Sequence, residues 1–157
     1  MICRATSGDA KALTELTIRS KSHWGYGKQQ IERWREELTV TEVYIAENEV
    51  YKCVDGNSLI GFYAFAPETE KKVKLNYLFI APEFIGLGYG KILMHDFYER
   101  ATAFGFQEVV LDADPHAEEF YSRLGFQKIG KLQSSIKNRF LPIMARFIPA
   151  PRTQSLK

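Results

Sequence analysis

Hydrophobic and polar residues alternate with two different periods along the chain, and each period predicts one kind of element. Apolar residues spaced three and four apart, as on a helix with one buried face, occur in 7–24 and in 28–38. A period of two, typical of strands, occurs in 71–82, and the apolar stretch 43–68 is expected to hold two or three strands. The Asp55-Gly56 pair inside that stretch predicts a hairpin turn.

Turn and cap residues mark the other elements. A helix is predicted after residue 90 and ends at Gly105. Its expected apolar face is formed by Leu93, Phe97, Ala101 and Phe104. Another helix is predicted from the N-cap Asp114 and Pro115 to Leu124. Strands are expected over 1–6, 107–114, 126–133 and 139–148. The order β-α-α-β-β-β-α-β-α-β-β predicts a mixed α/β domain, not a repeating doubly wound one.

Composition narrows the class of protein. With 157 residues, 45% of them hydrophobic, the chain can form one soluble domain with a full core, which we expect over 1–148, followed by a tail at 149–157. The net charge of +2 does not favour nucleic acid or an anionic membrane as a partner. Cys3 and Cys53 match no metal-binding spacing, and without a leader or a membrane span the expected location is the cytoplasm.

Three glycines alternate just before the helix predicted after residue 90. Gly86, Gly88 and Gly90 are followed at once by Lys91. Bare amides at a helix start bind anions, and missing side chains let a phosphate approach them. The alternative is a loop that only turns tightly. The glycine spacing fits neither the dinucleotide fingerprint nor the P-loop, so the segment predicts an anion site of another kind.

The segment "LFIAPEFIGLGYGKIL" resembles the pyrophosphate-binding motif of the GCN5-related N-acetyltransferases. That motif reads Arg/Gln-x-x-Gly-x-Gly/Ala, and Gly88 and Gly90 occupy its glycine positions, whereas Ile85 replaces the first residue. "DADPHAEEFYSRLGF" is similar to a second element of the family, Asn-x-x-Ala-x-x-x-Tyr-x-x-x-Gly-Phe. Asp114 stands in place of its asparagine, and Ala117 and Tyr121 match.

The resemblance implies the family's fold, a mostly antiparallel sheet with two parallel strands that splay apart, flanked by about four helices. It also implies acetyl-CoA as the cofactor, held between the splayed strands 72–80 and 107–112. The first of these strands would bind the pantetheine arm and the glycine segment the pyrophosphate. The implied cofactor-binding residues are Leu78, Phe79, Ile80, Ile85, Gly86, Leu87, Gly88, Tyr89, Gly90, Lys91, Asp114, Ala117 and Tyr121.

The resemblance makes Tyr121 the proton donor to the departing thiolate. A phenol with a pKa near ~10 can protonate a thiolate whose acid has a pKa near ~8.5. The alternative is that Tyr121 only packs on its helix. We expect the neighbouring Phe120 to belong to the core.

The general base is harder to find, because the family often carries a glutamate on the strand that corresponds to 72–80. The inward residues here are Lys74 and Asn76, and neither is a carboxylate. The proton would then leave through water, or through His23, His116 or Asp114.

His23, Trp24 and Tyr26 lie between the two early helices, where the family shapes its acceptor pocket. We therefore expect His23 to bind substrate and relay a proton, and the two aromatic residues to form walls. A capping or surface role for His23, and a core position for Trp24, stay open.

The resulting prediction is an N-acetyltransferase that uses acetyl-CoA to modify an amine, either a small molecule or an exposed amino group. A non-catalytic acyl-CoA-binding module and a nucleotide-binding structural protein are the alternatives. The resemblance also suggests a homodimer, in which the apolar strand 139–148 could take part.

Overall fold

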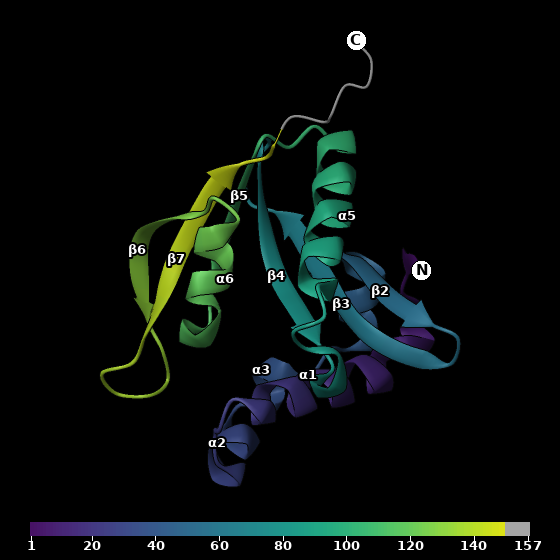
Figure 1. Cartoon of the computed structure of the whole chain (residues 1–157), viewed down its shortest axis with the longest axis vertical. Coiled ribbons are helices and arrows are strands. Elements are labelled where there is room, and N and C mark those ends of the chain that lie inside the picture. The colour runs from purple at the N-terminus through teal and green to yellow at the C-terminus, as the bar shows by residue number, and fades with distance from the viewer. Residues whose placement is uncertain (150–157) are drawn as a thin grey trace. The chain divides into compact units, whose positions relative to one another are not determined.

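The computed structural model describes residues 1–149 of the chain (Figure 1). Its strands are β1 Ile2–Arg4, β2 Glu49–Asp55, β3 Ser58–Pro67, β4 Lys72–Ile80, β5 Glu108–Asp112, β6 Gln127–Gln133 and β7 Phe140–Phe147. Its α-helices are α1 Ala10–His23, α2 Lys28–Arg33, α3 Arg35–Leu38, α4 Glu42–Glu47, α5 Tyr89–Ala103 and α6 Glu118–Arg123. Short 3₁₀ turns precede three of these helices, at Ser7–Asp9, Pro82–Phe84 and Pro115–Ala117.

The strands form a mixed sheet with the order β1-β2-β3-β4-β5-β7-β6. β4 and β5 pair in parallel, whereas β1–β2, β2–β3, β5–β7 and β6–β7 pair antiparallel. The parallel register joins Lys72, Val73 and Lys74 to residues 108–110. The predicted mixed α/β architecture with a mostly antiparallel sheet is therefore confirmed.

The chain divides into two compact units. The first comprises Met1–Ala66 and Leu75–His95, and the second comprises Pro67–Lys74 and the chain from Asp96 onward. The single domain over 1–148 stays a prediction, and residues 150–157 of the expected tail lie outside the described part of the chain. No helix within residues 1–149 is both long and apolar enough to cross a lipid bilayer.

The first unit is built on apolar residues from α1, α4 and the strands β2 and β3. In α1, Leu13 and Leu16 are almost completely buried, as the helical spacing predicts. The other buried members of this core are Ala5, Val40, Ile45, Val50, Phe62, Ala64 and Ala81. At about 25 cal/mol per Å² of buried apolar surface, such a cluster is the main stabilising contribution to the unit.

The second unit has its own buried residues on β5, β7 and the helices. Val109 and Leu111 of β5 and Met144 of β7 are at most 2% exposed. Phe97 and Ala101 of α5 are fully buried, one turn apart. Phe104 was expected on that face, but it is 57% exposed because α5 already ends at Ala103.

Two early predictions are corrected. The helix expected over 28–38 is two helices, because it breaks at the buried Trp34, whose ψ of −1° departs from helical values. The start of the stretch 43–68 is the helix α4 and not a strand. Thr41 caps that helix by accepting a hydrogen bond from the Tyr44 amide at 2.9 Å, and of its six residues Ile45 is buried.

Candidate active site

The glycine segment, which belongs to the first unit, forms a loop before α5 in which two residues have a left-handed backbone conformation. Gly86 and Gly88 have φ of 84° and 90°, values that side chains rarely allow. A Cβ placed on either glycine would have no neighbour within 4 Å, so the space in front of this backbone is open. Gly90 lies within the first turn of α5, since the helix already begins at Tyr89.

The start of α5 presents amide groups to this open space. The Gly88 carbonyl accepts from Ile92 N at 3.3 Å, which makes Gly88 the residue that opens the helix. The first amides of a helix have no partner inside it, and the dipole of this 15-residue helix adds positive potential there. Lys91 is exposed in the same turn. The loop therefore has the open space and the positive potential that a diphosphate needs.

The strand before this loop has a backbone that β3 approaches closely. A Cβ on Gly61 of β3 would come within 2.6 Å of the Phe79 carbonyl oxygen, so a glycine is needed at this position. The three expected pantetheine contacts, Leu78, Phe79 and Ile80, are half-buried.

The two inward residues of β4 have different surroundings. Lys74 belongs to the second unit, where its Nζ lies 3.1 Å from Asp112 Oδ2. Asn76 belongs to the first unit, is exposed, and donates from Nδ2 to Tyr44 Oη at 3.0 Å. Neither residue supplies a carboxylate, so β4 itself offers no strong base.

In the second unit, Tyr121 is a buried phenol on α6. It is 7% exposed, and its ring packs against Phe120 at 5.1 Å and Phe126 at 5.4 Å. Burial, and to a lesser extent the neighbouring Tyr98, raise the pKa of Tyr121 well above its ordinary value. The phenol therefore keeps its proton at neutral and moderately alkaline pH.

Asp114 is the N-cap of the turn before α6, as predicted. Its Oδ1 accepts from the His116 amide at 2.9 Å and also lies 2.9 Å from His116 Nδ1. Its Oδ2 accepts from Arg139 Nη2 at 3.1 Å, in an ion pair whose side chains are 16% and 18% exposed. Ala117 ends the same turn, and His116 is exposed. These contacts give Asp114 a structural role in this unit.

The aromatic residues after α1 form two local pairs in the first unit. The His23 and Trp24 rings lie 5.0 Å apart, and Trp24 is 42% exposed, so it is not a core residue. Tyr26 packs against Trp34 at 4.8 Å, with Lys21 Nζ 5.6 Å from the Tyr26 ring. The side chain of Asn76 makes its hydrogen bond to Tyr44, which belongs to neither of these pairs.

Tyr44 is a residue that the sequence analysis did not single out. It lies on α4, in a stretch expected to be a strand, and its partner Asn76 is 32 residues away in sequence. Burial is the main reason why the pKa of Tyr44 rises to about 12. The Thr41 cap on α4 was the one available signal for the helix that carries it.

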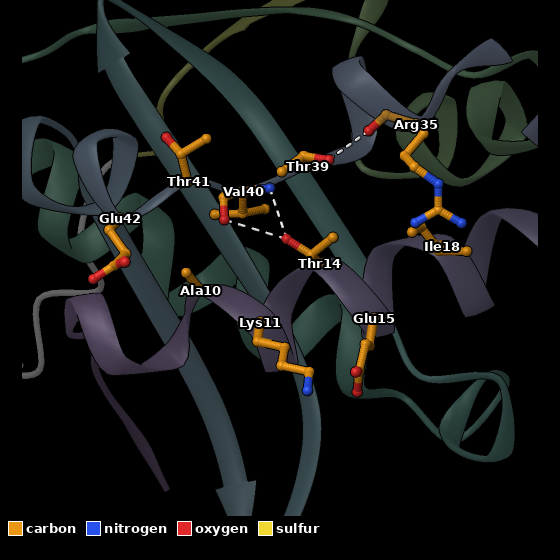
Figure 2. Close-up of a pocket in the computed structure, with 10 residues that line it drawn as sticks. All are labelled: Ala10, Lys11, Thr14, Glu15, Ile18, Arg35, Thr39, Val40, Thr41 and Glu42. Carbon is orange, nitrogen blue, oxygen red and sulfur yellow. Dashed lines mark hydrogen bonds between the residues drawn. The ribbon is translucent and has the colours of Figure 1, made fainter. Parts of the chain in front are cut away.

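The segment between α3 and α4 is fixed to α1 by a threonine. Thr14 Oγ1 accepts from Val40 N at 2.9 Å and donates to Val40 O at 3.2 Å (Figure 2). An open hollow of about 510 Å³ lies here. It is lined by Ala10, Lys11, Thr14, Glu15, Ile18, Arg35, Thr39, Val40, Thr41 and Glu42. It contains none of the predicted site residues.

Comparison with known families gives one match that covers most of the chain. The model of the acetyltransferase (GNAT) domain matches residues 23–145. That range includes His23, Asn76, the glycine loop and Tyr121.

Individual proteins that resemble this chain in sequence or in structure are also named as N-acetyltransferases. An uncharacterized N-acetyltransferase, ycf52, from Pyropia yezoensis is 32% identical over 75 residues, or 47% of this chain. The matched stretches span 43% and 59% of the length of two such curated relatives. A GCN5-related N-acetyltransferase structure from Rhodopseudomonas palustris has a TM-score of 0.76 at 18% identity, covering 94% of both chains. The PaiA N-acetyltransferase of Thermoplasma acidophilum, solved with coenzyme A, has a TM-score of 0.77 at 20% identity, covering 94% of this chain and 98% of that one.

Proposed function

Because the chain belongs to the GNAT acetyltransferase family, we propose that it transfers an acetyl group from acetyl-CoA to the nitrogen of an amine. The observation that carries the proposal is the loop before α5, where Gly86 and Gly88 leave open space beside the first amides of a long helix. Anion binding alone would suit many ligands, but within this family match it favours a diphosphate-bearing cofactor.

The residues proposed to hold acetyl-CoA lie on β4 and on the loop. Leu78, Phe79 and Ile80 would contact the pantetheine arm, and the segment Ile85–Lys91 the pyrophosphate. Ile85 offers no polar group at the first motif position, so the amides and Lys91 are left to bind the charge. From the resemblance, Asp114, Ala117 and Tyr121 complete the proposed cofactor contacts. When bound, acetyl-CoA supplies the activated acetyl group.

Tyr121 is proposed to hold a proton on Oη for the sulfur that departs in the reaction. A donor must hold its proton at the working pH, and the raised pKa of Tyr121 meets that condition while making the phenol a weaker acid. Packing by Phe120 and Phe126 supports this role, since the ring has a defined orientation.

The acceptor is proposed to be a small-molecule amine or an exposed amino group on a peptide. His23, Trp24 and Tyr26 are proposed to contribute to its binding, with His23 or water removing the proton from the amine. The exposed position of Trp24 supports contact with a ligand. We also propose that the enzyme acts in the cytoplasm, which fits Cys3 and Cys53 being present as thiols, and that it can form a homodimer.

The test is the release of free thiol from acetyl-CoA in the presence of a panel of amines, with coenzyme A binding measured by calorimetry on the same protein. Amine-dependent thiol release is the expected result. Binding of coenzyme A without release for any amine would instead favour a non-catalytic acyl-CoA-binding module. Tighter binding of ATP than of coenzyme A would contradict both.

A further inference from the structure

Three side chains and one backbone carbonyl of the first unit form a connected polar and aromatic cluster from three elements. Asn76 of β4 donates to Tyr44 Oη of α4 at 3.0 Å. The Tyr44 ring meets the Tyr77 ring edge to face, with centroids 5.4 Å apart. Tyr77 Oη then donates to the backbone carbonyl of Glu37, in α3, at 3.3 Å. We call these residues the Tyr44–Tyr77 cluster.

The rings of the cluster pack on the apolar core. The centroid of the Tyr77 ring lies 5.9 Å from that of the fully buried Phe62 and 6.2 Å from that of Phe79. Tyr44 and Tyr77 both pack against the apolar core of the unit and are half-buried, so part of each residue is accessible to solvent. Asn76 and Glu37 are exposed beside them. The arrangement is therefore a rigid aromatic surface with polar groups at its margin.

The two segments that carry the cluster, 36–48 and 75–80, hold acidic residues as their only charged ones. Tyr77 Oη is hydrogen-bonded to the Glu37 carbonyl, and the negative charge of Glu37 adds to burial in raising the pKa of Tyr77. Residues 36–48 include Glu36, Glu37, Glu42 and Glu47 but no Lys, Arg or His, and residues 75–80 carry no charge. Arg35, just before this stretch, is paired with Glu32 at 2.7 Å.

We propose that Glu37, Tyr44 and Tyr77 receive the acceptor amine as its ammonium ion, and that the protein therefore prefers amines without a carboxylate beside the amino group. This inference rests on the proposed acetyl transfer. Aromatic faces and a carboxylate both attract an ammonium group. A free amino acid would bring a second carboxylate toward Glu37 and Glu42, where residues 36–48 offer no cation to receive it and Arg35 of α3 is paired with Glu32.

Asn76 acts in this proposal as a positioning residue. Its amide fixes the Tyr44 phenol, so the ring edge and the hydroxyl keep one orientation toward the incoming amine. The asparagine can donate to Tyr44 Oη, whereas an ionised carboxylate at this position could only accept from the phenol and would add a negative charge beside it.

Cadaverine and lysine are a matched pair for the test, because they differ by one carboxylate. Each is titrated into the full-length protein by calorimetry at low ionic strength, with and without coenzyme A. Cadaverine is expected to bind about tenfold more tightly than lysine. Glu37→Gln should weaken cadaverine binding about fivefold and reduce the preference. Glu36→Gln, the same charge change one residue away, is the control and should weaken it less than about twofold.

The outcomes separate this inference from the proposed function. Equal binding of cadaverine and lysine, equal effects of Glu37→Gln and Glu36→Gln, or no binding of either amine would each overturn the inference. In these cases thiol release from acetyl-CoA with other amines would still uphold acetyl transfer. Failure to bind coenzyme A and to release thiol would overturn acetyl transfer, while Glu37-dependent cadaverine binding would still identify the ammonium site. Both glutamates are exposed, so the two variants are expected to fold, which circular dichroism checks.

Discussion

Two alanine substitutions in the glycine loop should have opposite effects on stability. Gly88 has a φ of 90°, and its missing Cβ faces open space, so Gly88→Ala meets backbone strain and not a collision. Gly90 lies within α5, where alanine is the better helix former. The two variants add the same methyl group two residues apart, and each is the control for the other.

The magnitudes follow from these two conformations. A left-handed conformation costs a residue with a Cβ roughly 1–2 kcal/mol, whereas alanine in place of glycine inside a helix contributes up to about 1 kcal/mol. The free energies of unfolding of the two variants should therefore differ by about 1–3 kcal/mol. For a domain of this size, that corresponds to melting temperatures roughly 2–12 °C apart.

The affinity for coenzyme A supplies the functional readout. If Gly88→Ala relieves its strain by turning one amide away from the pyrophosphate, the lost bond to a charged group costs roughly 1.5–3 kcal/mol, about 10–150-fold in Kd. Gly90→Ala should bind within about threefold of the wild type, because the motif that this loop resembles accepts alanine there. Gly90→Val should lose affinity without losing stability, since its branched side chain covers the amides but leaves a helical φ.

Calorimetry with coenzyme A tests the predicted affinities, and thermal unfolding of the same samples tests the predicted stabilities. Unchanged affinity for coenzyme A in both Gly88→Ala and Gly90→Val would refute the loop as the pyrophosphate site. If Gly88→Ala melted at or above the temperature of Gly90→Ala, the assigned backbone conformation of residue 88 would be wrong.

Substitutions at Tyr121, Thr14, His23 and Asn76 test separate parts of the protein. Tyr121→Phe should lower turnover by roughly 10²-fold with little change in coenzyme A affinity, and unchanged turnover would contradict its role as the proton donor. Because burial raises the pKa of Tyr121, the wild-type rate should not fall near pH ~9–10 through loss of this proton, and a fall there that is absent in the variant would contradict the raised pKa. Thr14→Val removes both bonds to Val40 and should lower the free energy of unfolding by roughly 1–3 kcal/mol in urea titrations, whereas Thr14→Ser should lower it less. His23→Ala should change the pH profile of kcat/KM if His23 relays the proton, and Asn76→Glu should raise the rate at neutral pH if proton removal is limiting. A wild-type profile that already levels off near pH ~5 and is unchanged in His23→Ala would point to a carboxylate base elsewhere.

The sequence predicted best those elements whose signals are local. The helix over 7–24 and the hairpin at Asp55-Gly56 follow from spacing and turn chemistry within a few residues, and the structure contains both. Residues 43–47 were wrongly predicted as a strand, because Val43 and Ile45 occupy alternate positions as in a strand. The N-cap at Thr41 decides for a helix, in which Ile45 is buried and Val43 is 63% exposed.

The residues of the candidate site also differ in whether a local sequence signal marks them. The loop of Gly86, Gly88 and Gly90 is contiguous and could be found by reading alone, because a glycine signals a backbone state. Tyr44 and Glu37 could not be found in this way. Their contacts with Asn76 and Tyr77 join residues 32 and 40 positions apart, and nothing in the sequence marks such pairs.

The placement of these two groups of residues has a consequence for specificity. Glu37 and Tyr44 flank the segment that Thr14 fixes to α1, whereas the glycine loop is defined by its own backbone and by the start of α5. A change in Thr14 or in residues 38–42 would shift the carboxylate and the phenol together and leave the amides of the loop in place. Amine preference and cofactor affinity should therefore respond to different substitutions. On this view a related chain can change its acceptor by altering the α3–α4 segment while keeping the loop that binds acetyl-CoA.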